Sequence, residues 1–357
     1  MVRAPSEATT KPSELLGSIQ PPVLVSSQSP TVACVGRSRA STQRAASLLN
    51  RFLTVIPGSP ARVSGGGHSR AYGGMMLVQF SEGAGSAVHD ALALPPHWAR
   101  RLSSLHFAYQ PLVATDTMQP VGVEALLRGV SALGVPSIHA LFDQAYAEGV
   151  LHAFDLALRS HVIAAAGPAL KASGARLFYN LDTRCVLDVN YAPGCTAELL
   201  TAAGLEPGQV CLEISEQHEV VPRAHVERLL CAYREQGYAL ALDDYGVGFG
   251  QMRTLFLTDP QVLKVDRFFV TGADVDVKRQ FFLSRLCDFA HALGIEVVAE
   301  GVETAAELAI CRELGFDIVQ GYALRRPQDD IHAALSALDA IPEARRMGTT
   351  RLSGTDD

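Results

Sequence analysis

Eight short apolar runs recur between about residue 100 and residue 340, and most of them contain or end on a polar residue. They read FAYQPLV, VGVEALL, RLFYN, VCLEIS, LALDD, VLKVD, EVVAE and DIVQG. Runs of this length and apolar character are typical of buried strands. Several intervals between them place apolar residues at helical spacing, as in residues 139–166, 225–237 and 279–294. Eight strands with intervening helices predict an α/β fold, a (β/α)8 barrel of the TIM type.

The connection between the first two runs departs from this pattern. Only ATDTMQP separates them, whereas a parallel crossover needs roughly a dozen residues or more. We therefore expect the first two strands to form a hairpin. The prediction is a modified barrel in which one strand is antiparallel to the rest.

The two ends of the sequence lack this periodicity. Residues 1–95 are rich in Ser, Ala, Gly and Pro, and residues 341–357 are mostly polar. Segments of such composition bury too little apolar surface to fold by themselves. We therefore expect a low-complexity, disordered or loosely ordered N-terminal segment, a barrel domain over residues 100–340 and a flexible tail.

Composition narrows the class of protein. The chain has 357 residues, 48% of them hydrophobic, which is ample for a core of barrel size. Its formal net charge of −7 argues against non-specific nucleic-acid binding, so no DNA partner is expected. None of the seven cysteines forms a C-x-x-C pair, which favours reduced thiols in the cytoplasm over a disulfide framework. No apolar run is long enough to predict a membrane span.

Polar residues at the ends of the runs are the candidates for chemistry, because barrels of this kind carry their active sites at the carboxyl ends of the strands. These residues are Glu124, Asn180, Glu213, Asp243, Asp244, Lys264, Asp266, Glu300 and Gln320. Carboxylate and amide oxygens are the ligands that Mg²⁺ and Mn²⁺ prefer. The adjacent Asp243 and Asp244 repel each other unless a cation lies between them, and they can reach two different ions. Two metal ions suit phosphodiester hydrolysis.

Each of these residues also has an ordinary explanation when it is taken alone. An Asp-Asp pair after a strand is more often a solvated turn or a helix cap. Lys264 can form a structural ion pair with Asp266, and we favour a structural role for Asp266. Glu303 is typical of a helix start, and Arg325 and Arg326 fit a phosphate contact or a solvated rim equally well. The recurrence of polar residues at successive strand ends favours the metal site.

Seven motifs in order resemble those of one family. They are VGVEALLRG, FYNLD, LEISE, LDDYGVGFG, LKVDRFFV, VVAEGVET and QGYALRRP. They are similar to the motifs of the EAL-domain family of bacterial cyclic di-GMP phosphodiesterases, over roughly residues 100 to 335. The resemblance implies the barrel with one antiparallel strand. It also implies Mg²⁺- or Mn²⁺-dependent opening of cyclic di-GMP to linear pGpG, and a homodimer.

The resemblance also implies roles for individual residues. The metal ligands would be Glu124, Asn180, Glu213 and Asp243 for a first ion, with Asp243 bridging to a second ion held also by Asp244 and Glu300. The catalytic set would be Glu124, Lys264, Glu300 and Gln320, with Lys264 orienting the attacking water. The substrate-binding set would be Arg128 at a phosphate, with Gln110 and Leu126 nearby. Glu216 would steady the loop after Asp244.

That loop departs from the family pattern. The usual sequence is D-F-G-T-G-Y-S-S, and here Val247 stands at the threonine and Gly250 at the first serine. Loss of the threonine hydroxyl removes a hydrogen bond that could tie the loop to Glu216. In the family this loop couples dimerisation to metal binding, so two alternatives stay open: a non-catalytic cyclic di-GMP receptor and a protein-interaction module. The complete set of acidic residues and Lys264 favours the enzyme.

Overall fold

The computed structural model describes residues 93–188, 191, 194–215, 223–247 and 251–338. All structural statements below concern these residues. The predictions for the tail over residues 341–357, for Glu216 and for Gly250 lie outside them, as does nearly all of the predicted N-terminal segment.

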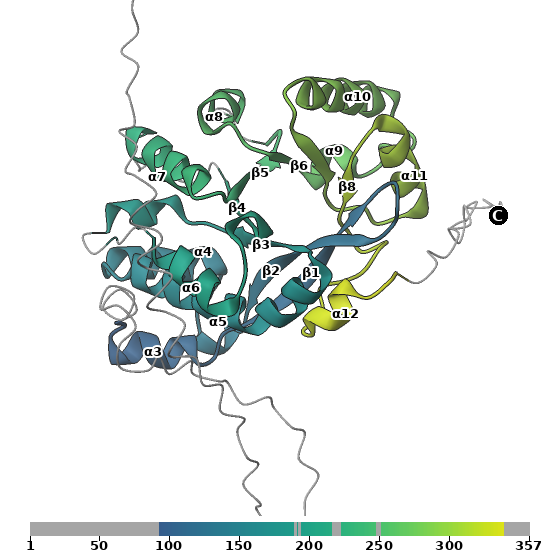
Figure 1. Ribbon diagram of the computed structural model, residues 1–357. Helices are drawn as coiled ribbons and strands as arrows, with labels where there is room; N and C mark the ends of the chain where they lie inside the picture. The colour runs from purple at the N-terminus through teal and green to yellow at the C-terminus, as the bar shows by residue number, and fades with distance from the viewer. Residues whose placement is uncertain (1–92, 189–190, 192–193, 216–222, 248–250, 339–357) are drawn as a thin grey trace, which may run out of the picture. The chain divides into compact units, whose positions relative to one another are not determined.

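Eight strands close into a barrel in sequence order (Figure 1). They are β1 (His106–Ala114), β2 (Pro120–Arg128), β3 (Arg176–Asn180), β4 (Val210–Ile214), β5 (Ala239–Tyr245), β6 (Val262–Val265), β7 (Glu296–Ala299) and β8 (Ile318–Val319). Each predicted run overlaps one strand. The predicted eight-stranded barrel is therefore confirmed.

The first strand runs against both of its neighbours. β1 pairs antiparallel with β2 and with β8, and all other neighbouring strands are parallel. The predicted hairpin is confirmed. Because β1 is reversed, its first half lies level with the carboxyl ends of the other strands, and its register sets Gln110 opposite Glu124.

Helices surround the barrel (Figure 1). They are α3 (Pro96–Leu102), α4 (Ile138–Ala147), α5 (Leu151–Ser173), α6 (Cys195–Ala203), α7 (Arg223–Glu235), α8 (Gln251–Thr258), α9 (Arg267–Val270), α10 (Val277–Ala292), α11 (Ala305–Leu314) and α12 (Ile331–Leu335), with short 3-10 turns η1 (Val130–Leu133), η2 (Thr183–Leu187) and η3 (Pro207–Gln209). The periodic segment 139–166 is divided between α4 and α5. The break falls at Gly149, whose φ of 67° is left-handed and cannot continue a helix. No helix among the described residues is long and apolar enough to cross a membrane.

Strand alternation separates an inner core from an outer one. Leu112, Phe178, Cys211, Val262 and Val298 belong to a buried cluster contributed by strands alone, which fills the barrel. The alternate residues of β3, Leu177 and Tyr179, pack outward against the helices. The filled interior leaves the carboxyl ends of the strands as the place for a site.

Candidate active site

The strand ends bring the predicted polar residues together around one lysine. Lys264 on β6 is only 1% exposed. Its Nζ lies 2.6 Å from Glu213 Oε1, 2.8 Å from Asp243 Oδ1, 2.8 Å from Glu300 Oε1 and 3.5 Å from Glu124 Oε2. Four carboxylates from β2, β4, β5 and the end of β7 thus converge on one ammonium group. We call these four carboxylates, Asp244 and the central Lys264 the carboxylate cluster.

Two amide side chains join this cluster. Asn180 Nδ2 donates to Glu124 Oε1 at 3.1 Å and to Glu213 Oε2 at 3.0 Å. Gln320 Nε2 donates to Glu124 Oε2 at 2.8 Å. Asn180 therefore faces the carboxylates and does not cap the following segment, where Asp182 caps η2 instead.

Asp243 and Asp244 reach the same side of the sheet because β5 carries a bulge. Leu242 pairs with Leu263 and Tyr245 with Val265, so the two aspartates together oppose the single residue Lys264. In a regular strand, adjacent side chains would point to opposite faces. Asp244 has a φ of 54°, in the left-handed region that few residues other than glycine adopt. Such a conformation costs about 1–3 kcal/mol and persists where the surrounding structure requires it.

The cluster carries more negative charge than its lysine can balance. Burial raises the pKa of Glu213 well above its usual range and that of Glu300 to about 8. Burial and then Asp243 raise the pKa of Asp244 to about 6. Burial opposes ionisation of Glu124 too, but Lys264 and hydrogen bonds from Gln320 and Asn180 outweigh it and lower its pKa. Burial would likewise lower the pKa of Lys264, but the carboxylates, Asp243 first, raise it well above its usual value.

The donor atoms fit divalent cations. Asp243, Asp244 and Glu300 each offer a carboxylate oxygen, and these oxygens lie within 4.8 Å of one another. Glu213 Oε1 and Asp243 Oδ1 are buried at ion-pair distance from Lys264, yet no described donor reaches them with hydrogen-bond geometry. Buried carboxylate oxygens that outnumber their one lysine, in a group of hard oxygen ligands, are surroundings that suit Mg²⁺ or Mn²⁺.

A cleft of about 460 Å³ adjoins this cluster and is lined by Asp244, Gly246, Val247, Asp266 and Phe268. Asp266 caps α9 by accepting from Phe268 N at 2.8 Å, which confirms a structural role. The same side chain also lines the cleft and contributes to the raised pKa of Asp244. The effect of Asp266 on the pKa of Asp244 was not predicted, because the sequence carries no recognisable signal for the bulge in β5.

The predicted substrate-binding residues lie around the cluster without joining it. Arg128 Nη1 donates to the carbonyl of Leu127 at 3.0 Å, Gln110 is buried opposite Glu124, and Leu126 is half-buried. Their contacts with substrate stay predictions.

The two rim arginines have protein partners. Arg325 donates to carbonyls at the end of α12, among them that of Ala337 at 3.0 Å. Arg326 stacks on Tyr322 at 4.2 Å. Glu303 directly precedes Thr304, the N-cap of α11, in agreement with the predicted helix start, and its carboxylate pairs with Arg267 at 3.0 Å.

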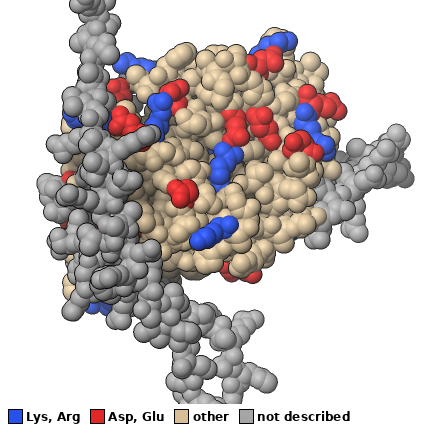
Figure 2. Space-filling view, viewed as in Figure 1, with Lys and Arg blue, Asp and Glu red and all other residues tan. Residues whose placement is uncertain are grey.

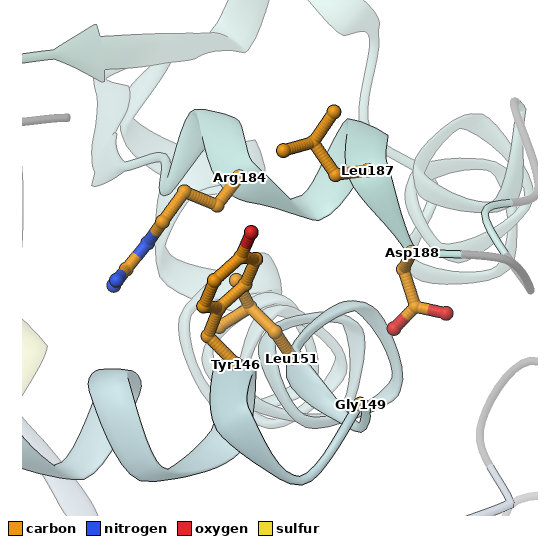
Figure 3. Close-up of a pocket in the computed structure, with 6 residues that line it drawn as sticks. All are labelled: Tyr146, Gly149, Leu151, Arg184, Leu187 and Asp188. Carbon is orange, nitrogen blue, oxygen red and sulfur yellow. The ribbon is translucent and has the colours of Figure 1, made fainter. Parts of the chain in front are cut away.

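The remaining surface shows no second acidic cluster of this kind among the described residues. On the face seen in Figure 2, acidic and basic side chains of the described residues are interspersed without a continuous basic stripe. A smaller cavity of about 130 Å³ lies between the α4–α5 turn and η2, lined by Tyr146, Gly149, Leu151, Arg184, Leu187 and Asp188 (Figure 3). None of these residues belongs to the carboxylate cluster.

Comparison with known sequences identifies the family. The EAL domain matches residues 98–327, which is more than half of the chain. The chain belongs to the EAL-domain family. Its match contains every residue of the carboxylate cluster. The predicted family resemblance is confirmed.

Several curated relatives cover the barrel. Cyclic di-GMP phosphodiesterase RocR of Pseudomonas aeruginosa is 31% identical over 239 residues, which are 63% of this chain and 57% of RocR. Probable cyclic di-GMP phosphodiesterase PdeB of Escherichia coli K12 is 26% identical over 226 residues, which are 62% of this chain and 43% of PdeB. An uncharacterized protein of Azorhizobium caulinodans is 31% identical over 237 residues and is covered to 32% of its length. The chain therefore spans between about a third and somewhat more than half of these relatives.

Solved structures agree on the fold. Klebsiella pneumoniae BlrP1, in complex with manganese and cyclic di-GMP, has a TM-score of 0.55 and 29% identity, over 63% of this chain and 56% of that chain. The EAL enzyme Bd1971 with bound cAMP has a TM-score of 0.59 and 25% identity, over 67% of each chain. BlrP1 has also been solved with calcium and cyclic di-GMP. Use of a divalent metal is thus supported for this barrel.

Proposed function

We propose that the protein hydrolyses cyclic di-GMP to linear pGpG in a reaction that depends on Mg²⁺ or Mn²⁺. The single observation that carries this proposal is the bulge in β5, which sets Asp243 and Asp244 on one side with Glu300. Backbone strain and adjacent like charges both cost free energy. Bound cations would neutralise the two carboxylates and offset that cost. Membership of the EAL-domain family supports cyclic di-GMP as the substrate.

Two ions would match the charge of the cluster. Five carboxylates and one ammonium leave a formal charge of −4, which two divalent cations would balance. We assign Glu124, Asn180, Glu213 and Asp243 to one ion, and Asp243, Asp244 and Glu300 to the other. Bound divalent ions lower the pKa of a coordinated water and stabilise the charge that develops on a phosphodiester.

The protein's own residues orient the reaction. We assign Lys264, whose Nζ is held by its carboxylates at the centre of the cluster, to orienting the attacking water. Gln320 fixes the Glu124 carboxylate through its 2.8 Å hydrogen bond. Arg128 is assigned to a substrate phosphate, because guanidinium groups bind phosphate with two parallel hydrogen bonds. Gln110 and Leu126 are assigned to the wall beside it.

We also propose a homodimer formed through an exposed apolar surface. Among the described residues between 247 and 282, nine large apolar side chains are at least 40% exposed. These residues, which we call the α8–α10 patch, are Val247, Met252, Phe256, Leu257, Phe268, Val275, Val277, Phe281 and Phe282. They lie on elements that follow the neighbouring strands β5 and β6 (Figure 1). Exposed apolar surface on this scale marks an interaction site, and most soluble oligomers are symmetric dimers.

The six described cysteines are all free, which supports a cytoplasmic location.

A cyclic di-GMP receptor without catalysis is the second candidate. Val247, 61% exposed in the cleft beside Asp244, is the observation that favours it, because it replaces a family hydroxyl next to a proposed metal ligand. The intact carboxylate cluster favours the enzyme.

Turnover and binding separate the two candidates. The full chain is incubated with cyclic di-GMP and Mn²⁺, products are followed by ion-pair chromatography, and binding is measured by calorimetry with Ca²⁺ in place of Mn²⁺. Glu124→Gln removes one charge from the cluster without changing its shape. Glu313→Gln is the matched control, because Glu313 is exposed on α11. We expect pGpG from the wild type and from Glu313→Gln, and none from Glu124→Gln. Binding without product would establish the receptor instead.

A further inference from the structure

A buried ion pair lies outside the barrel, on the inner face of α5. The side chains of Asp155 and Arg159 are 0% and 2% exposed, and Arg159 Nε donates to Asp155 Oδ2 at 3.0 Å. Arg159 Nη1 also donates to Thr196 Oγ1 on α6 at 2.7 Å and to the Tyr233 hydroxyl on α7 at 2.9 Å. One guanidinium therefore connects three helices, and its charge is balanced within the core.

The Asp155 carboxylate contacts the chain on both sides of Asn180. The Tyr179 hydroxyl, one residue before Asn180, donates to Asp155 Oδ1 at 2.9 Å. Cys185, in the η2 turn that follows, lies beside Asp155: burial, and then the charge of Asp155, raise the pKa of its thiol. Asn180 is thus the last residue of its strand. The residue before it and the turn after it both lie against the same carboxylate.

Stability alone does not account for this pair. Removing two charges from water costs about as much as their attraction returns, and apolar replacements of equal volume are often neutral or stabilising. What a fully hydrogen-bonded buried pair adds is a fixed geometry. The geometry fixed here is that of the end of β3, where Asn180 pairs with Glu213 in the β3–β4 register.

The η2 turn is held from its outer side as well. Arg184 contacts Asp182 at 2.7 Å and Asp143 on α4 at 2.6 Å, beside the cavity of Figure 3. These contacts fix the turn to the helices. Asp155 lies on the other side, hydrogen-bonded to the strand residue next to Asn180.

We infer that Asp155 is a positioning residue for the metal centre: through the Tyr179 hydroxyl it sets the end of β3 so that the Asn180 amide lies between Glu124 and Glu213. The inference rests on the proposed function, in which Asn180 is a metal ligand. Arg159 holds Asp155 in place through its hydrogen bond. Outer groups that orient a ligand usually change metal affinity when they are removed.

Tyr179→Phe tests this most cleanly, because it deletes one hydroxyl and leaves the Asp155–Arg159 pair intact. Tyr238→Phe is the matched control: Tyr238 is also buried beside the barrel, and its hydroxyl has no hydrogen-bond partner among the described residues. The measurement is the Kd for Mn²⁺ of the full chain, by calorimetry and by the electron paramagnetic resonance of bound Mn²⁺. Each variant is made in the wild-type chain and in the Asn180→Ala chain.

We expect Tyr179→Phe to weaken Mn²⁺ binding about five- to tenfold in the wild-type chain, less than the loss typical of direct outer contacts. In the Asn180→Ala chain it should have almost no further effect, because the two changes act through one residue. Tyr238→Phe should leave the Kd unchanged in both chains. An unchanged Kd in Tyr179→Phe, or an equal loss with and without Asn180, would overturn the inference alone. A wild type that binds no Mn²⁺ would overturn the proposed metal centre and this inference with it.

Discussion

At the scale of single residues, the conformation of Asp244 decides what the site can do. A regular strand would place Asp243 inside the barrel mouth and Asp244 outside it. The bulge opposite Lys264 and the positive φ of Asp244 bring both carboxylates to one cation-binding position. The structure therefore maintains a strained backbone and adjacent like charges together, a combination that is typical of functional sites.

Replacing Asp244 by glycine should separate stability from metal binding. Glycine adopts a φ of 54° without strain, and the change also removes one charge next to Asp243. With EDTA present, we expect Asp244→Gly to unfold at a higher temperature than the wild type, although it should lose hydrolysis and bind fewer Mn²⁺ ions. Asp243→Gly, at a residue of ordinary backbone conformation, is the control. A lower melting temperature for Asp244→Gly than for Asp243→Gly would contradict this account of the strain.

His152 should make the fold less stable in acid. Burial, and then the charge of Arg159, hold its pKa below the usual 6.5. His152 therefore binds a proton more readily in the unfolded chain than in the folded chain. The stability that neutral His152 contributes is complete above pH 6.5 and decreases as the pH falls below that value. The measurement is the urea midpoint at a series of pH values. His152→Gln should lose less stability than the wild type between neutral and mildly acidic pH, and equal losses would contradict the assignment.

At the scale of elements, the sequence was sufficient for the eight strands and for the reversed first strand. Apolar runs closed by polar residues mark a buried barrel strand, and a seven-residue connection excludes a crossover. Two features were not predictable. Residues 139–166 keep a helical pattern across Gly149, where the backbone turns, and the bulge in β5 leaves the apolar pattern unchanged. Both depend on backbone geometry, which hydrophobic periodicity does not record.

The grouping of several site residues was predictable from the geometry of a barrel. Strand ends on one side of a closed barrel must converge, so Glu124, Glu213 and Lys264 could be grouped before their distances were known. The position of Asp266 in the cleft and the hydrogen bonds of Asp155 could not, because they depend on side chains that meet across separate elements.

The loop after β5 should tolerate no side chain at Gly246. Its φ is 110°, and an added Cβ would lie 2.2 Å from Phe269 Cε2. Gly149 has a φ of 67° but no atom within 4 Å of such a Cβ, so it isolates the cost of the backbone conformation. We expect Gly149→Ala to lower the free energy of unfolding by about 1 kcal/mol, and Gly246→Ala by more, on the order of 2–4 kcal/mol. Equal losses in denaturant titrations would show that Phe269 moves aside easily.

At the scale of the whole molecule, the α8–α10 patch is the feature that a single chain leaves unexplained. Exposed apolar patches on a protein surface mark interaction sites, and this one borders the cleft beside Asp244 through Val247 and Phe268. A dimer through this patch would place the partner chain next to the metal site.

A charge within the patch should therefore prevent dimer formation. Phe281 is 67% exposed on α10, and Leu293, 45% exposed at the end of the same helix, lies outside the patch. Light scattering after gel filtration should give twice the chain mass of 38.1 kDa for the wild type and for Leu293→Arg. Phe281→Arg should elute as a monomer, because an unpaired charge within an apolar interface is costly to bury. A monomeric wild type would contradict the proposed dimer.

The most direct test of the central claim is to follow oxygen from solvent into product. The full chain is incubated with cyclic di-GMP and Mn²⁺ in H₂¹⁸O, and the products are analysed by mass spectrometry, with Lys264→Met as the variant that lacks the central ammonium. The account predicts pGpG that carries one ¹⁸O on its terminal phosphate, formed only by the wild type and only with the metal. Unchanged cyclic di-GMP, or labelled pGpG formed equally well by Lys264→Met, would contradict it.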